Sequence, residues 1–220
     1  MIWDLIKKDL RLEWRAREML PAFLLMGLLS LVVFSFAFDP ARPVRREAAP
    51  GAFWVAYLFT AVYGLGRAFV AEQQNDAWEG LLLSPVDRGI IFLSKACSTL
   101  IYLLLVSCIL IGLFTLFFDV HWGGHSWSWL LATFLASVGL SSLGTLFSAI
   151  SMRTRAREVM LPLLLLPLVV PLFLGGVKLT ERAFAGKPPG DDLAWLHLMI
   201  GFDVATVVVA WVLFEYVVQD

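Results

Sequence analysis

Apolar segments of about twenty residues recur six times along this chain, and they restrict its fold more than any other feature. We place them at about 20–38, 50–70, 96–118, 127–150, 159–178 and 194–218. An α-helix needs ~20 such residues to cross ~30 Å of hydrocarbon. Backbone polar groups in lipid must be satisfied within the protein, and a helix does this within one segment. The sequence therefore predicts an all-α integral membrane protein, with six transmembrane helices in a single domain over residues 1–220.

The composition agrees with this fold class and excludes several functions. Of the 220 residues, 60% are hydrophobic and 16% are charged, whereas a soluble domain is ~25% charged. The formal net charge of -1 gives no argument for a nucleic-acid partner. The chain contains no GxxxxGK[ST], HExxH, paired CxxC or GxSxG motif. We therefore expect no catalytic residue and no metal site, and any transport work must draw its energy from a partner or a gradient.

The distribution of Lys and Arg predicts the orientation of the chain in the membrane. Eleven of these residues flank the segments on the side of the N-terminus, and six lie on the opposite side. Loops rich in Lys and Arg usually stay in the cytoplasm. We therefore predict that both termini are cytoplasmic.

The first eighteen residues read as an amphipathic helix at the membrane surface. Its apolar residues recur at spacings of three and four, and its cations occupy other faces. The apolar set is Trp3, Ile6, Leu10 and Trp14, and the cationic set is Lys7, Lys8, Arg11 and Arg15. Asp4 and Asp9 lie near the start of this helix, where the helix dipole favours acidic side chains.

The stretch EQQNDAWEGLLLSPVDRGIIFLSK, residues 72–95, is a long polar interruption between the second and third segments. Its polar and apolar side chains divide between two sides of a short helix. The polar side is Glu72, Gln73, Asp76 and Glu79, and the apolar side is Ala77, Trp78, Leu81 and Leu82. Ser84-Pro85 ends this helix, and Asp87 can cap the next one near Gly89. We interpret the stretch as a docking surface for a cytoplasmic partner; a solvated loop is the alternative.

The histidine pair and an acidic residue in the last segment carry functional alternatives. His121 and His125, in HWGGHSWSW, can ligate haem iron or zinc, but a turn between interfacial tryptophans explains the same pattern. Asp203 lies about nine residues into the last segment, where a carboxylate is costly. It marks a proton or substrate path, pairs with a cation on another helix, or is a protonated or paired carboxyl that holds helices together. We favour the last.

Prolines and small residues shape the fourth and fifth segments. Pro162, Pro167 and Pro171 each remove a helical hydrogen bond, so we expect a kinked helix that serves as a gate or, as we favour, a static wall. The fourth segment carries a row of small residues that permits close helix contact, within one copy or between two. The row is Gly139, Ser141, Ser142, Gly144 and Ser148.

The chain resembles the cytochrome c maturation protein B, or haem exporter B, family over nearly its whole length. The likeness is carried by AAPGAFWVAYLFTAVYGLGRAF from Ala48, by the 72–95 stretch, by LPLLLLPLVVPLFLGG from Leu161 and by FDVATVVVAWVLFEYVVQD at the end. The pattern of Trp-Glu-Gly, Leu-Leu and Ser-Pro after an acidic residue is also similar to the wider ABC-2 permease class.

The resemblance implies a membrane subunit, itself not an enzyme, of an ABC-type complex in the bacterial inner membrane. ATP would be hydrolysed by a separate ATPase subunit, in a complex with two copies of each. Further expected partners are a multi-span haem-handling protein and a small one-span subunit. Haem would be the cargo of the complex, destined for c-type cytochromes, and in the family the haem-ligating histidines belong to a partner. The rival functions are an ABC-2 permease for another hydrophobic substrate, and a scaffold that transports nothing.

By position, residues 72–95 correspond to the coupling helix of such a complex. The resemblance implies that Glu72, Asp76, Glu79 and Gly80 face the ATPase, together with neighbouring Gln73 and Trp78. Leu83, Ser84 and Pro85 would fix the exit of this helix. A rigid element tied to two spans is suited to transmit a nucleotide-driven change in a partner.

Overall fold

The computed structural model describes residues 3, 5–9, 19–38, 44–68, 87–120, 126–151, 157–186 and 193–219. Over these residues the chain is built from helices, and residues 5–9 belong to a helical N-terminal segment. Six longer helices follow. They are α2 (Met19–Ala37), α3 (Val44–Ala68), α6 (Arg88–Phe118), α7 (Ser126–Ser151), α8 (Arg157–Phe184) and α9 (Leu193–Gln219).

Each long helix overlaps one predicted apolar segment, and three of them extend beyond it by six residues or more at one end. The helices α3 and α6 begin six and eight residues before the predicted starts at 50 and 96, and α8 ends six residues after 178. Hydropathy marks the part of a helix that suits lipid, whereas backbone hydrogen bonding continues into the polar flanks. Five of the described helices are long and apolar enough to cross a membrane, whereas the apolar part of α2, Leu24–Ala37, is shorter. The count of six spans stays a prediction.

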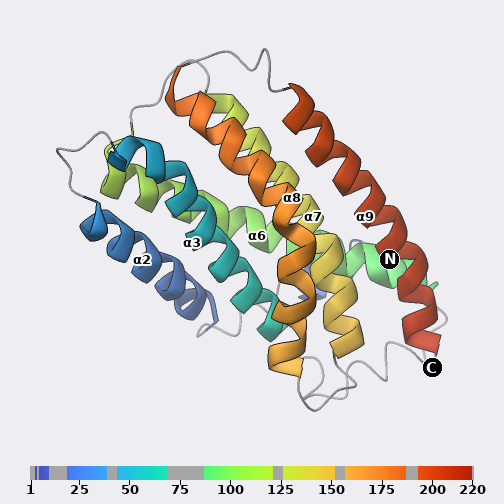
Figure 1. Ribbon diagram of the computed structural model, residues 1–220. Coiled ribbons are helices and arrows are strands. Elements are labelled where there is room, and N and C mark those ends of the chain that lie inside the picture. The colour runs from blue at the N-terminus through green and yellow to red at the C-terminus, as the bar shows by residue number, and fades with distance from the viewer. Residues whose placement is uncertain are drawn as a thin grey trace.

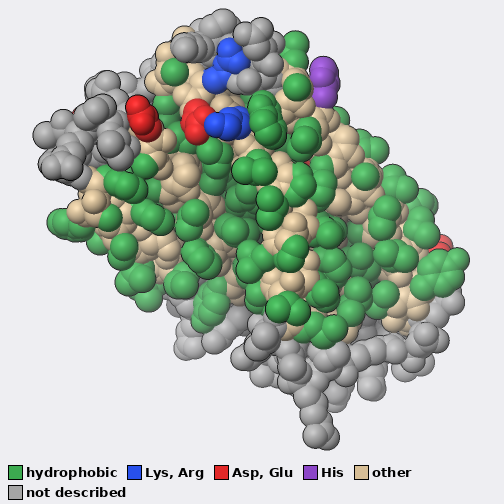
Figure 2. All heavy atoms as spheres, in the orientation of Figure 1, with side chains coloured by type: hydrophobic (Ala, Val, Ile, Leu, Met, Phe, Trp, Pro, Cys, Tyr) green, Lys and Arg blue, Asp and Glu red, His purple; other side chains and the backbone are tan. Residues whose placement is uncertain are grey.

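The helices pack as a bundle in which α7 is central (Figure 1). α7 contacts α3, α6, α8 and α9, whereas α2 packs on α3 and α6 at one side of the bundle. α6 crosses behind the other helices in this view (Figure 1). Figure 2 shows that the side chains coloured by type on this face are mostly hydrophobic, and that most of its charged side chains gather near one edge. This distribution suits a protein surrounded by lipid.

The row of small residues on α7 explains its central position. A Cβ atom added to Gly139 would lie 2.7 Å from Oδ1 of Asp203 on α9 and 2.8 Å from Cδ2 of Leu172 on α8. A Cβ atom added to Gly144 would lie 2.6 Å from two methyl carbons of Leu65 on α3. Both contacts are within one copy of the chain, so these two glycines serve intramolecular packing, one of the two uses that the sequence left open.

The two ends of α6 define the two ends of the bundle. At the Asp87 end, α6 begins beside the final parts of α7 and α9 in one apolar cluster. We call this the small cluster; it consists of Ile91, Phe92, Leu146, Ala149, Ala210, Phe214 and Val218. At the Asp119 end, α6 ends beside the start of α7 and the end of α8, where Phe114 contacts Trp129 and Phe184. Asp119 adopts a left-handed conformation with φ 51° and ends the helix.

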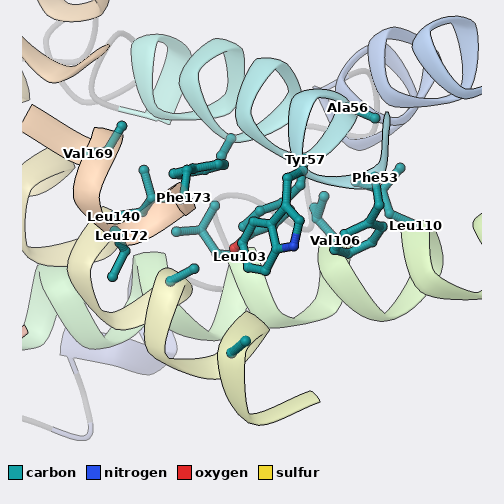
Figure 3. Packing of buried hydrophobic residues seen from close by; sticks show 14 of the residues in the cluster. Phe53, Ala56, Tyr57, Leu103, Val106, Leu110, Leu140, Val169, Leu172 and Phe173 are labelled. Atoms are coloured by element: carbon teal, nitrogen blue, oxygen red, sulfur yellow. The ribbon is translucent and has the colours of Figure 1, made fainter. Parts of the chain in front are cut away.

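Aromatic side chains fill the bundle toward the Asp119 end. The larger of the two apolar clusters, which we call the main core, includes Leu103, Val106 and Leu110 of α6 and Leu140 of α7. Figure 3 shows Phe53 and Tyr57 of α3 directed toward these α6 residues. Phe53 packs edge-to-face on Trp129, with ring centroids 5.0 Å apart, and Trp54 does the same with Phe173 at 5.3 Å. We call this group the aromatic cluster. It consists of Phe53, Trp54, Tyr57, Phe114, Phe118, Trp129, Phe173 and Phe184.

Hydrogen bonds satisfy two polar groups that this packing buries. The indole Nε1 of Trp54 donates to Oγ1 of Thr180 on α8 at 2.9 Å. The hydroxyl of Tyr57 shares a hydrogen bond of 2.7 Å with Oγ of Ser137 on α7. A buried polar group without a partner is destabilising, so these bonds allow large amphipathic rings to fill the core. They also fix α3 against both α7 and α8.

Candidate functional site

The end of the 72–95 stretch is held in place where α6 begins. The carboxylate of Asp87 accepts a hydrogen bond of 2.7 Å from the backbone N–H of Gly89, so the predicted helix cap is confirmed. Gly89 is buried against the indole of Trp211 on α9, and a Cβ atom added there would collide with that ring. The beginning of α6 is therefore fixed both by its own cap and by α9.

The residues proposed to contact an ATPase lie outside the described part of the chain. They are Glu72, Gln73, Asp76, Trp78, Glu79, Gly80, Leu83, Ser84 and Pro85. His121 and His125 also lie outside it. Their roles stay predictions, and the described residues that lie nearest to them in the chain are Asp87 after the first group and Val120 before the histidines.

A buried ion pair joins the N-terminal segment to α6. Nζ of Lys95 lies 3.3 Å from Oδ2 of Asp9, and these two residues are only 7% and 8% exposed. Nζ of Lys8 lies 3.4 Å from Oδ1 of the same carboxylate. Removing one partner of a buried pair leaves the other charge uncompensated and typically costs about 3–5 kcal/mol. This free-energy cost opposes the separation of Asp9 from Lys95.

Sequence reasoning missed this pair. It assigned Asp9 to the helix dipole, and it used Lys95 as one of the cations that set orientation and as the last residue of the 72–95 stretch, without naming a partner for it. One signal was present: Lys95 is the single charged residue between Arg88 and Asp119, in an otherwise uncharged segment. A cation embedded in such a segment usually has a partner. The partner itself was not readable, because nothing local links residue 9 to residue 95.

The N-terminal segment divides its side chains between the protein and the outside. Ile6 is 6% exposed and lies on the same side as Asp9, facing the bundle. Trp3 is 61% exposed, and Nζ of Lys7 lies 5.5 Å from the centroid of its ring. Of the apolar residues predicted to lie in the membrane surface, Ile6 is therefore covered by the protein, whereas Trp3 remains exposed.

Asp203 occupies the middle of the bundle, on α9 where it meets α7 and α8. It is 4% exposed, and neither carboxylate oxygen has a hydrogen-bond partner among the described residues. The nearby hydroxyls are directed to backbone oxygens: Thr206 Oγ1 donates to the carbonyl of Asp203 at 3.1 Å, and Ser142 Oγ to that of Gly139 at 3.0 Å. The absence of a side chain on Gly139 makes room for the carboxyl group.

The three prolines of α8 lie inside one continuous helix, Arg157–Phe184. Pro162, Pro167 and Pro171 therefore do not end it, and the predicted kink stays a prediction. A proline has no backbone N–H, so the carbonyl four residues before each of them receives no hydrogen bond from it. Leu165, Val169 and Leu172, between and beside the prolines, are buried in the main core, so α8 is held along this stretch by packing.

Comparisons with known proteins assign the family. A sequence model of the CcmB protein family matches residues 1–218. The chain belongs to the CcmB family. Heme exporter protein B of Paracoccus denitrificans is 28% identical over 196 residues, which cover 87% of this chain and 88% of the relative.

Two further relatives extend the match to other bacteria. Heme exporter protein B of Rhodobacter capsulatus is 27% identical, with 92% of this chain and 91% of the relative covered. The protein of the same name in Haemophilus influenzae is also 27% identical, with 90% and 89% covered. These matches confirm the resemblance predicted from the sequence. The family model covers residues 1–218, from the N-terminal segment to α9, so both Asp9 and Lys95 lie within the matched region.

Proposed function

We propose that this CcmB-family chain is the membrane subunit of an ABC-type complex for haem delivery or export in the maturation of c-type cytochromes. The observation that carries the proposal is the match to the family over residues 1–218, with relatives named heme exporter protein B. A separate subunit hydrolyses ATP, and this chain couples that reaction to the transfer or release of haem. It is not itself an enzyme, and it binds no cofactor of its own.

The proposal includes a topology. The chain crosses the bacterial inner membrane six times, and both of its termini are cytoplasmic. The helices α2, α3, α6, α7, α8 and α9 are then the six spans, and the Asp87 end faces the cytoplasm. The excess of Lys and Arg on that side supports this orientation.

The partners follow from the same proposal. An ATPase subunit docks on the segment before Asp87, and the complex also contains a multi-span haem-handling protein, a small one-span subunit and a second copy of this chain. The dense aromatic cluster favours coupling over conduction through the centre of one copy, because large buried rings occupy the space between α3, α6, α7 and α8. Haem would then move on a partner or between subunits.

Deletion and purification test the function as a whole. Deleting the gene should abolish c-type cytochromes, and the purified chain should bring with it the ATPase and the haem-handling protein. An intact cytochrome pool after deletion would refute the proposal. Loss of lipid or drug export with intact cytochromes would instead support an ABC-2 permease. If deletion of the gene abolishes cytochromes but a complex with an inactive ATPase still matures them normally, the result would support a scaffold.

Charge reversal tests the docking segment. Exchanging Asp76 and Glu79 for lysine should release the ATPase while the chain remains inserted, because like charges at a docking surface repel a partner that is complementary to acids. The matched control is Glu181→Lys, since Glu181 is an exposed acid at the other end of the bundle. We expect capture of the ATPase to fall at least tenfold for the double variant and to stay unchanged for the control. Equal capture for both would show that these acids do not dock it.

A further inference from the structure

The ion pair between Asp9 and Lys95 lies close to the point where the docking segment joins the bundle. Lys95 follows the Asp87 cap by eight residues, which is about 12 Å along a helix. The N-terminal segment therefore reaches α6 within about two helical turns of its first residue.

Both sides of this contact are fixed. On α6, the hydroxyls of Ser94 and Ser98 are directed to backbone carbonyls of their own helix, at 2.8 and 2.9 Å. Lys95 lies among packed neighbours on this helix, because Ser94, Ser98 and Thr99 are buried as well. On the N-terminal segment, Ile6 and Asp9 face the bundle three residues apart.

We propose that the Asp9–Lys95 ion pair makes the N-terminal segment a positioning element for the start of α6, so that residues 5–9 and the first turns of α6 move as one unit. This inference rests on the proposed function, because it assumes that the ATPase acts through residues 72–86. A force on that segment is transmitted through the capped start of α6, and the ion pair carries it to residues 5–9. Asp9 and Lys95 are positioning residues and touch neither ATP nor cargo.

The alternative is that the pair only neutralises a buried cation. In that case the N-terminal segment would be a passive anchor at the membrane surface, with Trp3 and Lys7 in contact with headgroups. The two possibilities differ in one measurable respect. A positioning element must stay attached for ATP hydrolysis to be coupled to haem transfer, whereas a passive anchor need not.

Hydrogen exchange of the whole complex in lipid nanodiscs tests the attachment. Asp9→Asn and Lys95→Met should each raise the exchange rate of the amides of residues 5–9 by about tenfold or more, since exchange reports local opening. The exchanged pair, Asp9→Lys with Lys95→Asp, should restore slow exchange if the variant folds. The apolar pair Asp9→Leu with Lys95→Met provides a second rescue, because a buried ion pair can often be replaced by packed apolar residues. Unchanged exchange in both single variants would overturn the attachment.

Cytochrome maturation per ATP hydrolysed tests the positioning role. The single variants should lower this ratio severalfold while the ATPase still co-purifies, and either rescued pair should recover it. Lys7→Gln is the matched control, because Lys7 lies on the exposed side of the same segment. Faster exchange with an unchanged ratio would overturn the positioning role. Intact cytochromes after deletion of the gene would refute the proposed function but leave the exchange result standing, so the two failures are distinguishable.

Discussion

The two ends of the bundle are stabilised in different ways. At the Asp119 end, large aromatic rings from α3, α6, α7 and α8 contact one another, and two of them are hydrogen-bonded to other helices. At the Asp87 end, the small cluster has two aromatic residues, Phe92 and Phe214, supplemented by a helix cap and an ion pair. Many overlapping ring contacts therefore stabilise the first end, whereas the second end depends on a smaller apolar cluster and a few specific polar contacts.

This difference suits the two ends to different tasks. An arrangement that changes on nucleotide hydrolysis needs contacts that can be exchanged singly, and packed interiors do not deform continuously. In the proposed function, the aromatic cluster would provide a fixed reference for the bundle, and the Asp87 end would be the part that the ATPase subunit moves.

Matched phenylalanines test the comparison directly and should give the largest effects. Phe53 and Phe214 are both fully buried, one in the aromatic cluster and one in the small cluster. Phe53→Ala should lower the free energy of unfolding by about 3–5 kcal/mol. Phe214→Ala should lower it by no more than the lower limit of that range, because the small cluster contains fewer large described side chains than the aromatic cluster. Equilibrium unfolding in mixed detergent micelles, followed by circular dichroism, measures both. Equal losses would contradict the comparison.

An exposed phenylalanine on α7 provides the control for both variants. Phe134 is 44% exposed and lies on the outer surface of the bundle. Phe134→Ala should change the free energy of unfolding by less than about 1 kcal/mol, because the lost contacts in micelles are largely with detergent.

The positions of the helices were predictable from the sequence, whereas the contacts between them were not. Runs of apolar residues located every long helix to within several residues, and the Asp87 cap followed from a local pattern of proline, acid and glycine. The hydrogen bond from Trp54 to Thr180 joins residues 126 positions apart. Neither residue has a local feature that identifies the other, because pairing across a bundle depends on which helix faces meet.

The candidate site divides in the same way. The oddity of Asp203 is visible in the sequence, since a carboxyl in an apolar segment is costly wherever the segment lies. Its surroundings are set by α7 and α8, and the glycine that accommodates it is 64 residues earlier, at position 139. Finding the Asp9–Lys95 pair requires knowing where the N-terminal segment lies and which side of α6 faces it. Local patterns fix neither.

Matched glycines test how tightly the aromatic cluster is packed. A Cβ atom added to Gly176 on α8 would collide with the ring of Trp54, whereas one added to Gly201 on α9 would meet nothing within 4 Å. Gly176→Ala should therefore destabilise the chain by about 1–3 kcal/mol. Gly201→Ala should be neutral or slightly stabilising, since alanine favours a helix by up to ~1 kcal/mol over glycine. The same unfolding measurement compares them. A neutral Gly176→Ala would show that Trp54 can shift and that this end is less rigid than its contacts indicate.

Asp203 lies between the two ends, and its amide variant should have the smallest effect on stability. No described side chain donates a hydrogen bond to the carboxyl or pairs with it. Asn has nearly the same shape, so Asp203→Asn should fit beside Gly139 and change the free energy of unfolding by less than about 1 kcal/mol. Asp203→Leu, which adds volume beside Gly139 and Leu172, should cost about 1–3 kcal/mol. Cytochrome maturation then separates the interpretations of this residue. If the carboxyl only packs helices together, the Asn variant should mature cytochromes normally; a stable Asn variant without maturation would assign Asp203 to a proton or substrate path.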